Sequence, residues 1–369
     1  MKKLKNLDAF AFIAGYHVLL VALLPFVWGD LSLLVWGLFL ITFVIGGLSI
    51  TAGYHRLFAH RSYEAHPLLE WFVLVGSTLA FQWSALSWAH DHRLHHNHVD
   101  TEKDPYSIEK GFWYAHIGWL FSYQQVFDKK LAGDLLKNPR VMFQHRHYLP
   151  LAIVVNLVVW GAACLLVSPL AAFWGVFLLR VFALHHCTWF INSLAHTFGS
   201  KTYAKELSAV DNALLAFVTF GEGYHNYHHA FAADYRNGVR WYHFDPTKWF
   251  IWAAHKCGLA GKLRKVNQVQ VLKTLIQKDR KLLVERLEEE ADQRAVELRS
   301  KVESIAAQYE TTATNLIRKM KALRDSGADM RDNLRAEIKA LRAELSHYWK
   351  EWLNLTRTIS LQYELAHHH

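Results

Sequence analysis

Residues 9–28 read AFAFIAGYHVLLVALLPFVW, and residues 31–54 read LSLLVWGLFLITFVIGGLSITAGY. A helix that crosses a bilayer needs about 20 consecutive apolar residues, and each stretch is long enough. Only Gly29 and Asp30 separate the two stretches, so we expect a helical hairpin. The chain starts Met-Lys-Lys-Leu-Lys, and positive charge is typical of the cytoplasmic side. The second helix is therefore expected to return to the cytoplasm near His55.

The composition indicates a membrane-embedded body that carries a polar tail. Of the 369 residues, 52% are hydrophobic and 20% are charged, whereas a soluble domain has about 25% charged residues. The long apolar runs lie within residues 9–195, and most of the charge follows residue 261. This division excludes one uniform soluble domain. The net charge of +9 suits a membrane surface, and no basic cluster interleaved with aromatic residues indicates nucleic acid.

Three more apolar runs follow, at 67–89, 148–167 and 170–195. The sequences on both sides of the 67–89 run are basic and rich in histidine, whereas the turns at 29–30 and 167–169 carry no Lys or Arg. A single crossing by 67–89 would place its two basic flanks on opposite sides of the membrane. We therefore expect this run to be membrane-associated without spanning, with a true crossing as the alternative.

These assignments predict an all-α fold: a four-helix transmembrane bundle with a cytoplasmic, histidine-rich di-metal cap. The membrane domain is expected over residues 1–261, with spanning helices at about 9–28, 31–54, 148–167 and 170–195. Both termini are expected in the cytoplasm, and the expected location is a bacterial inner membrane.

The tail after residue 261 has a different pattern. Apolar residues from Leu298 to Leu345 recur mostly every three or four positions, with Glu, Lys and Arg between them, which indicates a long amphipathic helix or coiled coil. Asp325-Ser326-Gly327 is a candidate break where the tail folds back as two antiparallel helices. We expect a helical extension over 262–366, followed by the remnant of a purification tag at 367–369. The extension either self-associates or docks an electron donor, or it is a solvated appendage.

Three tight histidine clusters carry the candidate chemistry: His55-Arg-Leu-Phe-Ala-His60, His92-Arg-Leu-His95-His96 and His225-Asn-Tyr-His228-His229. Residues i, i+3 and i+4 of an α-helix share one face, so the second and third clusters should each converge. His60 lies about 140° around an α-helix from His55. That pair is expected to reach one site only near a frayed helix end, or else to contact two metals.

Each cluster falls just cytoplasmic of an apolar run, and His196 ends the fifth run at the same level. Nine histidines should therefore meet at the membrane–cytoplasm interface, and this number suits two ions better than one. Neutral imidazole suits iron, zinc, copper or nickel, and a set without thiolate favours redox iron over structural zinc. His185 and His186, inside the fifth run, are expected to be buried and hydrogen-bonded, and His116 is expected to face headgroups or solvent.

The sequence resembles the integral membrane fatty acyl desaturases, which are stearoyl-CoA desaturase-like di-iron enzymes of the Δ9 type. The resemblance covers roughly residues 10–260 and rests on the three histidine clusters together with five further stretches. These are Ala80-Phe81-Gln82, Trp88-Ala-His-Asp91, Asp104-Pro105, Gly111-Phe-Trp-Tyr-Ala-His-Ile-Gly-Trp119 and Asn192-Ser-Leu-Ala-His196. The sequence Gly221-Glu-Gly-Tyr before the third cluster narrows the resemblance toward the Δ9 type.

The resemblance implies a metal site and an acyl tunnel. Two iron ions, which zinc could replace in recombinant material, would be held by His55, His60, His92, His95, His96, His196, His225, His228 and His229, and by Asn192 through a water. Gln82, Trp88, Thr188 and Trp189 match positions that line the bent part of the tunnel. Phe43 and Gly47 match positions that close the tunnel around the methyl end, and Asp91 matches an acidic residue near the thioester headgroup. His90 stands where the family often has Arg, which leaves acyl-CoA, an acyl carrier protein and an acyl-lipid open as carriers.

The resemblance also implies a reaction and its partners. O2 would be the co-substrate, a saturated acyl chain in the membrane would receive a cis double bond, and two electrons would come from an external donor. That donor would be of the ferredoxin, rubredoxin or cytochrome b5 type, since we recognise no fused cytochrome b5 domain. A membrane di-iron hydroxylase or alkane monooxygenase is the alternative within enzymes, and product analysis separates the two. A histidine-rich metal carrier or sensor is the alternative outside enzymes, although it would place its ligands near the bilayer centre.

Overall fold

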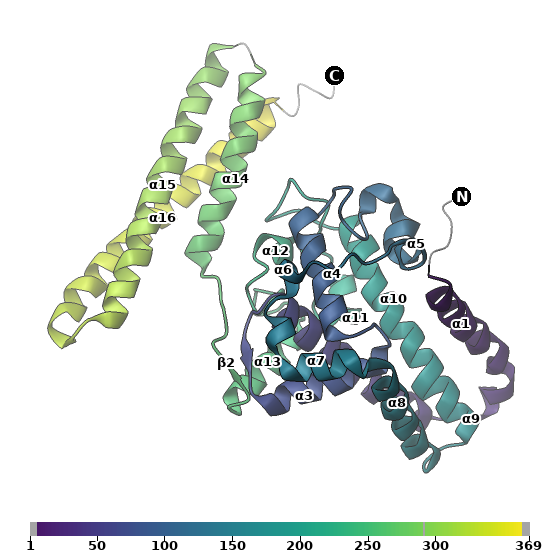
Figure 1. Ribbon diagram of the computed structural model, residues 1–369. Helices are drawn as coiled ribbons and strands as arrows, with labels where there is room; N and C mark the ends of the chain where they lie inside the picture. The colour runs from purple at the N-terminus through teal and green to yellow at the C-terminus, as the bar shows by residue number, and fades with distance from the viewer. Residues whose placement is uncertain (1–5, 291, 364–369) are drawn as a thin grey trace. The chain divides into compact units, whose positions relative to one another are not determined.

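The computed structural model describes residues 6–290 and 292–363, and the chain divides into two compact units, Met1–Lys265 and Val266–His369 (Figure 1). The boundary expected from the sequence lay at 261/262. The lysines at the start of the chain and the expected tag remnant at 367–369 lie outside the described residues.

The described part of the first unit is built of helices, with one pair of very short strands. Its α-helices are α1 (Leu7–Val27), α2 (Leu33–Leu48), α3 (Pro67–Gly76), α4 (Ala85–His98), α5 (Trp119–Ser122), α6 (Lys129–Ala132), α7 (Pro139–Arg146), α8 (Tyr148–Cys164), α9 (Pro169–Ala172), α10 (Arg180–Ser193), α11 (Ala213–Val218), α12 (His225–Ala230) and α13 (Pro246–Lys256). Three segments are π-helical, η2 (Ser49–Ala59), η5 (Tyr114–Gly118) and η7 (Phe173–Leu179). Short 3₁₀ turns are η1 (Trp28–Asp30), η3 (Ser77–Ala80), η4 (Ile108–Lys110), η6 (Leu135–Lys137) and η8 (Leu194–His196). The predicted all-α fold is confirmed.

Within the described residues, three continuous helical segments are long and apolar enough to cross a membrane: Leu7–Asp30, Leu33–Ala59 and Pro169–His196. Large apolar side chains such as Val21 and Phe26 point outward from the first of them, being 73% and 74% exposed, as a lipid-facing surface requires. Two bent helix pairs would raise the number of spans to five if each pair crossed once. The predicted count of four spanning helices therefore stays a prediction.

The expected non-spanning run at 67–89 contains one of these bends. The helix that starts at Pro67 ends at Ala80, and α4 leaves it at 83°. In the connecting turn, Phe81 and Trp83 have φ of +50° and +66°, a left-handed conformation that costs a non-glycine residue about 1–2 kcal/mol. The Ser84 side chain caps α4 by accepting from the backbone N–H of Ser87.

One hydrophobic core joins η2, α3, α4 and α13, and we call these four elements the cap of the first unit. Tyr54, Leu74, Leu86 and Ile251 are each 2% exposed or less and belong to that core. The strands β1 (Glu64–Ala65) and β2 (Ala260–Gly261) pair antiparallel, with Glu64 opposite Gly261. The core and the strands fix the segment after the first histidine cluster against the end of α13.

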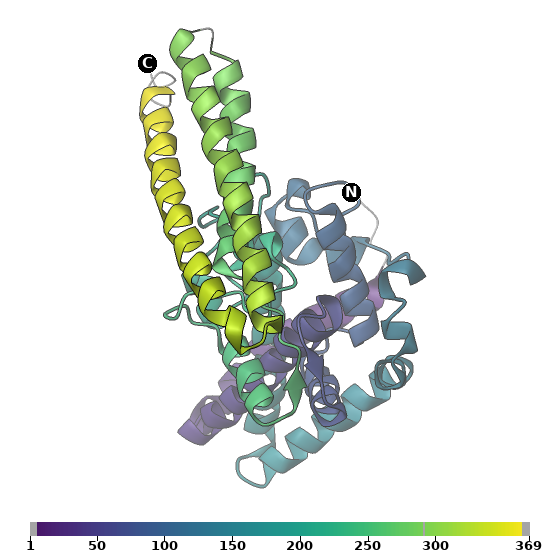
Figure 2. The ribbon, with the colours of Figure 1, turned by 90° about the vertical axis from the view of Figure 1, so that its left-hand side faces the viewer.

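The described part of the second unit consists of three long helices, α14 (Gln268–Glu288), α15 (Gln293–Asp325) and α16 (Ala328–Tyr363). They run alongside one another (Figure 2) around a core of their own that includes Leu298, Tyr309 and Trp352. The predicted break at 325–327 falls between α15 and α16. The expectation of two helices is wrong, because the apolar repeat that predicted them begins at Leu298 and omits α14.

Candidate metal centre

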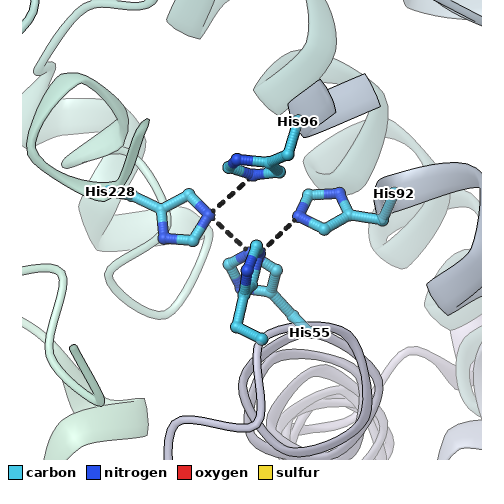
Figure 3. Close-up of side chains that lie close together, drawn as sticks. His55, His92, His96 and His228 are labelled. Carbon is cyan, nitrogen blue, oxygen red and sulfur yellow. Dashed lines mark hydrogen bonds between the residues drawn. The ribbon is translucent and has the colours of Figure 1, made fainter. Parts of the chain in front are cut away.

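The nine histidines of the predicted site gather in two groups. His55, His60, His92, His96 and His228 form the first group, and His95, His196, His225 and His229 form the second. In each group, one ring nitrogen from every member lies within 4.8 Å of the others. The rings of His55, His92, His96 and His228 point toward one shared centre (Figure 3). The division into two groups suits the two ions that the sequence predicted, and the role of these residues as ligands stays a prediction.

A π-helix brings His55 and His60 together. In a π-helix each N–H bonds to the carbonyl five residues earlier, so residues five apart lie above one another. The N–H of His60 donates to the His55 carbonyl at 3.0 Å, at the end of η2. The two ring centroids are 4.7 Å apart. The 140° separation expected from an α-helical period therefore does not apply, and neither a frayed end nor two metals is needed to bring this pair to one group.

The Nε2 atoms within each group face one another. His228 Nε2 lies 3.0 Å from both His55 Nε2 and His96 Nε2, and His60 Nε2 lies 2.8 Å from His92 Nε2. In the second group, His225 Nε2 lies 3.1 Å from His196 Nε2 and 3.0 Å from His229 Nε2. The pattern is the same in both groups, so both present ring nitrogens to a small shared volume.

Two carboxylates outside the groups determine which nitrogen of their partner ring carries the proton. His55 Nδ1 lies 2.8 Å from the Glu222 carboxylate, and His95 Nδ1 bonds to Asp104 at 2.9 Å. A carboxylate is an acceptor only, so each Nδ1 carries the proton and each Nε2 presents a lone pair. Convergent lone pairs from neutral imidazoles are the donor set that a transition metal needs. The two groups therefore fit a di-metal site.

His196 is oriented by a two-step contact. The hydroxyl of Ser208 donates to Asp100, so its oxygen accepts from His196 Nδ1 at 2.6 Å. The Nε2 lone pair of His196 is thus also directed inward. Asp100 adopts a left-handed φ of +61° at this position, which is consistent with a backbone constrained by its neighbours.

An ion cluster supports the Glu222 carboxylate. The Arg56 side chain is 1% exposed and donates both to Glu222, at 2.9 Å and 3.1 Å, and to Asp245, at 3.0 Å and 3.2 Å. Burial acts to raise the pKa of Glu222, but the neighbouring Arg56 and His55 outweigh burial and the pKa is lowered. Glu222 is therefore ionised at neutral pH. Asp245 also caps α13 by accepting from the backbone N–H of Lys248, which ties that helix to the site.

The histidines of the third cluster are uncharged at neutral pH. Burial, together with the neighbouring histidines, lowers the pKa of His225, His228 and His229 well below the usual value of 6.5. A charged imidazole cannot bind a metal ion, so this shift keeps the donors available.

Of the substrate-contact candidates for the bend, one contacts the first histidine group and two contact each other. Gln82 Nε2 donates to Thr188 Oγ1 at 2.8 Å, and Trp88 stacks on His92 with centroids 4.9 Å apart. Trp189 is buried against the rings of His116 and His185. The candidates for the bend of the tunnel therefore occupy one region, and their contact with an acyl chain stays a prediction.

The candidates for the methyl end lie together on α2. The ring of Phe43 packs against Phe220 at 5.3 Å, and a Cβ added at Gly47 would lie 2.1 Å from the same Phe220 ring. The sequence did not single out Phe220, which follows the apolar helix α11 and has a left-handed φ of +58°.

Asn192 is half-buried on α10, four residues before His196. Asp91 accepts from His90 Nδ1 at 3.0 Å and from the Tyr123 hydroxyl at 3.3 Å. The His90 side chain is fully buried and stacks on Phe127. His90 therefore orients Asp91 and has no free face for a headgroup.

Two expectations for the other histidines have different outcomes. His185 and His186 are both hydrogen-bonded, as predicted, but only His185 is buried, since His186 is half-buried. The expectation that His116 faces headgroups or solvent is wrong, since its side chain is 2% exposed and contacts Ser193 and His186.

Several positioning residues were not predicted as such from the sequence: Arg56, Asp100, Asp104, Tyr106 and Ser208. Asp104 and Arg56 belong to stretches that the resemblance already used, so their proximity to the clusters was a usable signal. Tyr106 bonds to His92 Nδ1 at 3.2 Å. Ser208 sits in a loop 12 residues from its partner His196, and no spacing rule predicts such a contact.

Comparison with known proteins gives an independent result. The family model for fatty acid desaturase matches residues 31–258. A probable acyl-CoA desaturase of Schizosaccharomyces pombe is 43% identical over 254 residues, which are 66% of this chain and 52% of that protein. Acyl-CoA desaturase 1 of Saccharomyces cerevisiae is 40% identical over 243 residues, which are 65% of this chain and 48% of that protein.

A third relative is matched over almost its full length. The sn-1 stearoyl-lipid 9-desaturase of Anabaena variabilis is 34% identical over 264 residues, which are 70% of this chain and 94% of that protein. By contrast, the chain spans about half the length of the two yeast proteins. The family match covers more than half of the chain and includes all nine histidines. The apolar helices and this match indicate an integral membrane protein, and the chain belongs to the fatty acid desaturase family.

Proposed function

We propose that this protein is an O2-dependent fatty acyl desaturase that introduces a cis double bond at carbon 9 of a saturated acyl chain. The observation that carries the proposal is the pair of histidine groups whose Nε2 lone pairs converge, in a chain of the desaturase family. The named relatives include acyl-CoA desaturases and a stearoyl-lipid 9-desaturase.

Iron is the proposed metal, with one ion in each histidine group and Asn192 acting on one of them through a water. Two iron ions held there would supply, with O2 and two external electrons, the oxidising power that removal of hydrogen from unactivated methylenes requires. The chain's own contribution is orientation. Glu222, Asp104 and Ser208 hold ligand rings in one tautomer, and such outer contacts typically change metal affinity by 10–100-fold.

The substrate is proposed to bend beside Gln82 and Thr188 and to end near Gly47 and Phe220. Trp88, a further candidate for the bend, stacks on His92 of the first histidine group, so we propose that a bound chain passes the metal centre. Orientation of this kind matters because a displacement of about 1 Å can cost 10²-fold in rate.

The carrier is proposed to be either CoA or a membrane lipid, since relatives of both kinds are matched. The buried His90, at the position where the family often has Arg, supplies no exposed cation there. The electrons are proposed to come from a separate ferredoxin, rubredoxin or cytochrome b5, delivered on the cytoplasmic side, where we propose that both termini lie.

Expression in a host with a defined fatty-acid composition tests the proposal. We expect the intact chain to produce monounsaturated fatty acids, identified by mass spectrometry with the double bond located, and to contain about two iron ions per chain. His95→Ala and His228→Ala should each abolish the product and lower the metal content while membrane insertion is retained. His347→Ala, an exposed histidine of α16, is the matched control. Hydroxylated products without a double bond would favour the hydroxylase alternative, and full activity in either site variant would contradict the proposed site.

A further inference from the structure

The turn between η3 and α4 is strained and places the polar side chain of Gln82 between two left-handed residues. Phe81 and Trp83 both adopt left-handed φ, at +50° and +66°, and neither is a glycine. Gln82 lies between them, and the two helices that meet there are bent by 83°. Left-handed non-glycine residues persist only when their surroundings constrain them, and they are typical of functional positions. The contacts that hold this turn in place therefore indicate its function.

One set of contacts to the turn comes from Tyr54 on η2 and Gln144 on α7. The Tyr54 hydroxyl donates to the Trp83 carbonyl at 2.9 Å and accepts from Gln144 Nε2 at 2.6 Å. Gln144 Oε1 accepts from the backbone N–H of Ala85 at 2.9 Å. Tyr54 and Gln144 are fully buried, so the start of α4 is fixed by a closed polar network.

A second set approaches from the membrane-spanning helices, through Tyr16 on α1 and His185 on α10. His185 Nε2 lies 2.8 Å from the Ala80 carbonyl, which can only accept, so Nε2 carries the proton. His185 Nδ1 therefore accepts from the Tyr16 hydroxyl, at 2.9 Å. Tyr16 is 3% exposed and His185 is 4% exposed. We call this pair of residues the Tyr16–His185 clamp.

The clamp acts on the part of the chain that places Gln82. The Ala80 carbonyl that it binds comes directly before Phe81, whose ring also packs against Phe12 of α1 at 5.4 Å. Gln82 Nε2 donates to Thr188 Oγ1, and Thr188 lies three residues after His185 on α10. Gln82 Oε1 is buried with no hydrogen-bond partner among the described residues. Gln82 thus presents a free acceptor from a backbone position that two separate networks fix.

The same turn fixes α4, which carries Trp88 and the second histidine cluster. A shift at residues 80–84 would move Gln82 relative to His92, and so would move the bend of a bound chain relative to the metal centre. Polar side chains within a spanning region are costly unless they are paired. The hydroxyl of Tyr16 is paired with His185 Nδ1, and His185 Nε2 is paired with the Ala80 carbonyl of the turn.

We propose that Tyr16 and His185 are positioning residues that determine which acyl carbon meets the metal centre, by holding the strained turn at Phe81–Trp83 in place. This inference rests on the proposed desaturase function. It assigns to the clamp a role in the position of the double bond, not in the removal of hydrogen itself.

Four variants of the full chain in lipid nanodiscs test the inference. Tyr16→Phe removes only the hydroxyl, and His185→Leu removes the bond to Ala80. His185→Gln keeps a side-chain N–H that can reach the same carbonyl. His17→Phe is the matched control, because His17 stacks on Tyr16 and bonds to His186 on α10 but, among the described residues, forms no hydrogen bond with the turn.

The position of the double bond is the first readout. Tyr16→Phe and His185→Leu should raise the share of displaced double-bond isomers by roughly fivefold or more, because small misplacements change which carbon reacts. His185→Gln should restore most of the wild-type ratio, and His17→Phe should leave it unchanged. A lower total rate with unchanged isomer ratios in both variants would overturn the inference, since a merely structural role predicts that result.

Hydrogen exchange of the backbone is the second readout and needs no turnover. Exchange over residues 78–88 should increase in Tyr16→Phe and His185→Leu, but not in His17→Phe. Unchanged exchange in both clamp variants would overturn the inference even if the protein made no unsaturated product. An intact chain without any desaturation would contradict the proposed function alone, because the exchange result judges the clamp separately.

Discussion

Asp104 illustrates, at the scale of one residue, how the histidine site is kept ready to bind metal. Its carboxylate is 1% exposed, accepts from His95 Nδ1 and from the backbone N–H of Tyr106, and so holds one imidazole in one tautomer. This contact leaves the lone pair on His95 Nε2, which faces the other members of the second group. The Asp104 carboxylate therefore determines whether His95 presents a lone pair to a metal ion.

Asp104→Asn should weaken metal binding without unfolding the protein. The amide keeps the shape but can donate to His95 Nδ1, which would turn the lone pair away from the metal. We expect metal affinity to fall by about 10–100-fold, measured as metal retained after dialysis against a graded series of chelator concentrations. Asp332→Asn, at an exposed position of α16, is the control. Equal retention in the two variants would show that Asp104 does not orient His95.

The lowered pKa values of His225, His228 and His229 predict acid lability of the metal-free protein. An imidazole whose folded-state pKa lies below its unfolded value of about 6.5 binds more protons in the unfolded state as the pH falls. Stability should therefore be full above about pH 6.5 and should decrease below it. Thermal unfolding of metal-free protein between pH 5 and 8 measures this slope, and His228→Gln should reduce it. A melting temperature that does not change over this range would contradict the lowered pKa values of these three histidines.

At the scale of elements, η2 determines whether the first histidine cluster can converge. The α-helical period places His92, His95 and His96 on the regular helix α4. The members of the second and third clusters nevertheless divide between the two histidine groups, so neither cluster converges on one group as expected. The α-helical period could not predict His55 with His60, because nothing in the local residues indicates a change to π-helical hydrogen bonding. The bend at 81–84 could not be predicted from the sequence either, because Phe and Trp rarely adopt left-handed φ.

Gly53, within η2, allows this element to approach α3. A Cβ at this position would lie 2.7 Å from Val73 Cβ, too close without a shift of one element. Gly53→Ala should therefore lower stability by about 1–3 kcal/mol and reduce metal content, measured by thermal unfolding and metal analysis. Gly37→Ala lies on the same continuous helix with nothing within 4 Å of the added atom, so it should have no such effect. Similar losses in both variants would indicate that helix propensity, not the contact with α3, matters at these positions.

At the scale of the whole molecule, the family match and the candidate site occupy only one of the two units. The fatty acid desaturase match ends at residue 258, and the first unit ends at Lys265. All nine histidines, their acidic partners and the clamp lie before that boundary. The second unit has its own core around Tyr309 and Trp352. A unit with a separate core contributes little to the stability of the other unit unless the two share an interface.

Deletion of residues 270–366 should therefore leave the metal centre intact. We expect metal content per chain close to that of the intact protein, and an unchanged double-bond position when an artificial electron donor is supplied in excess. Metal analysis and product analysis of both proteins in matched nanodiscs make the comparison. If activity falls only when a natural protein donor is limiting, the second unit docks that donor, as the sequence suggested for the extension. If metal is lost with the helices, the division into a metal-binding unit and an independent helical unit is wrong, because the ligand rings would then depend on contacts outside the first unit.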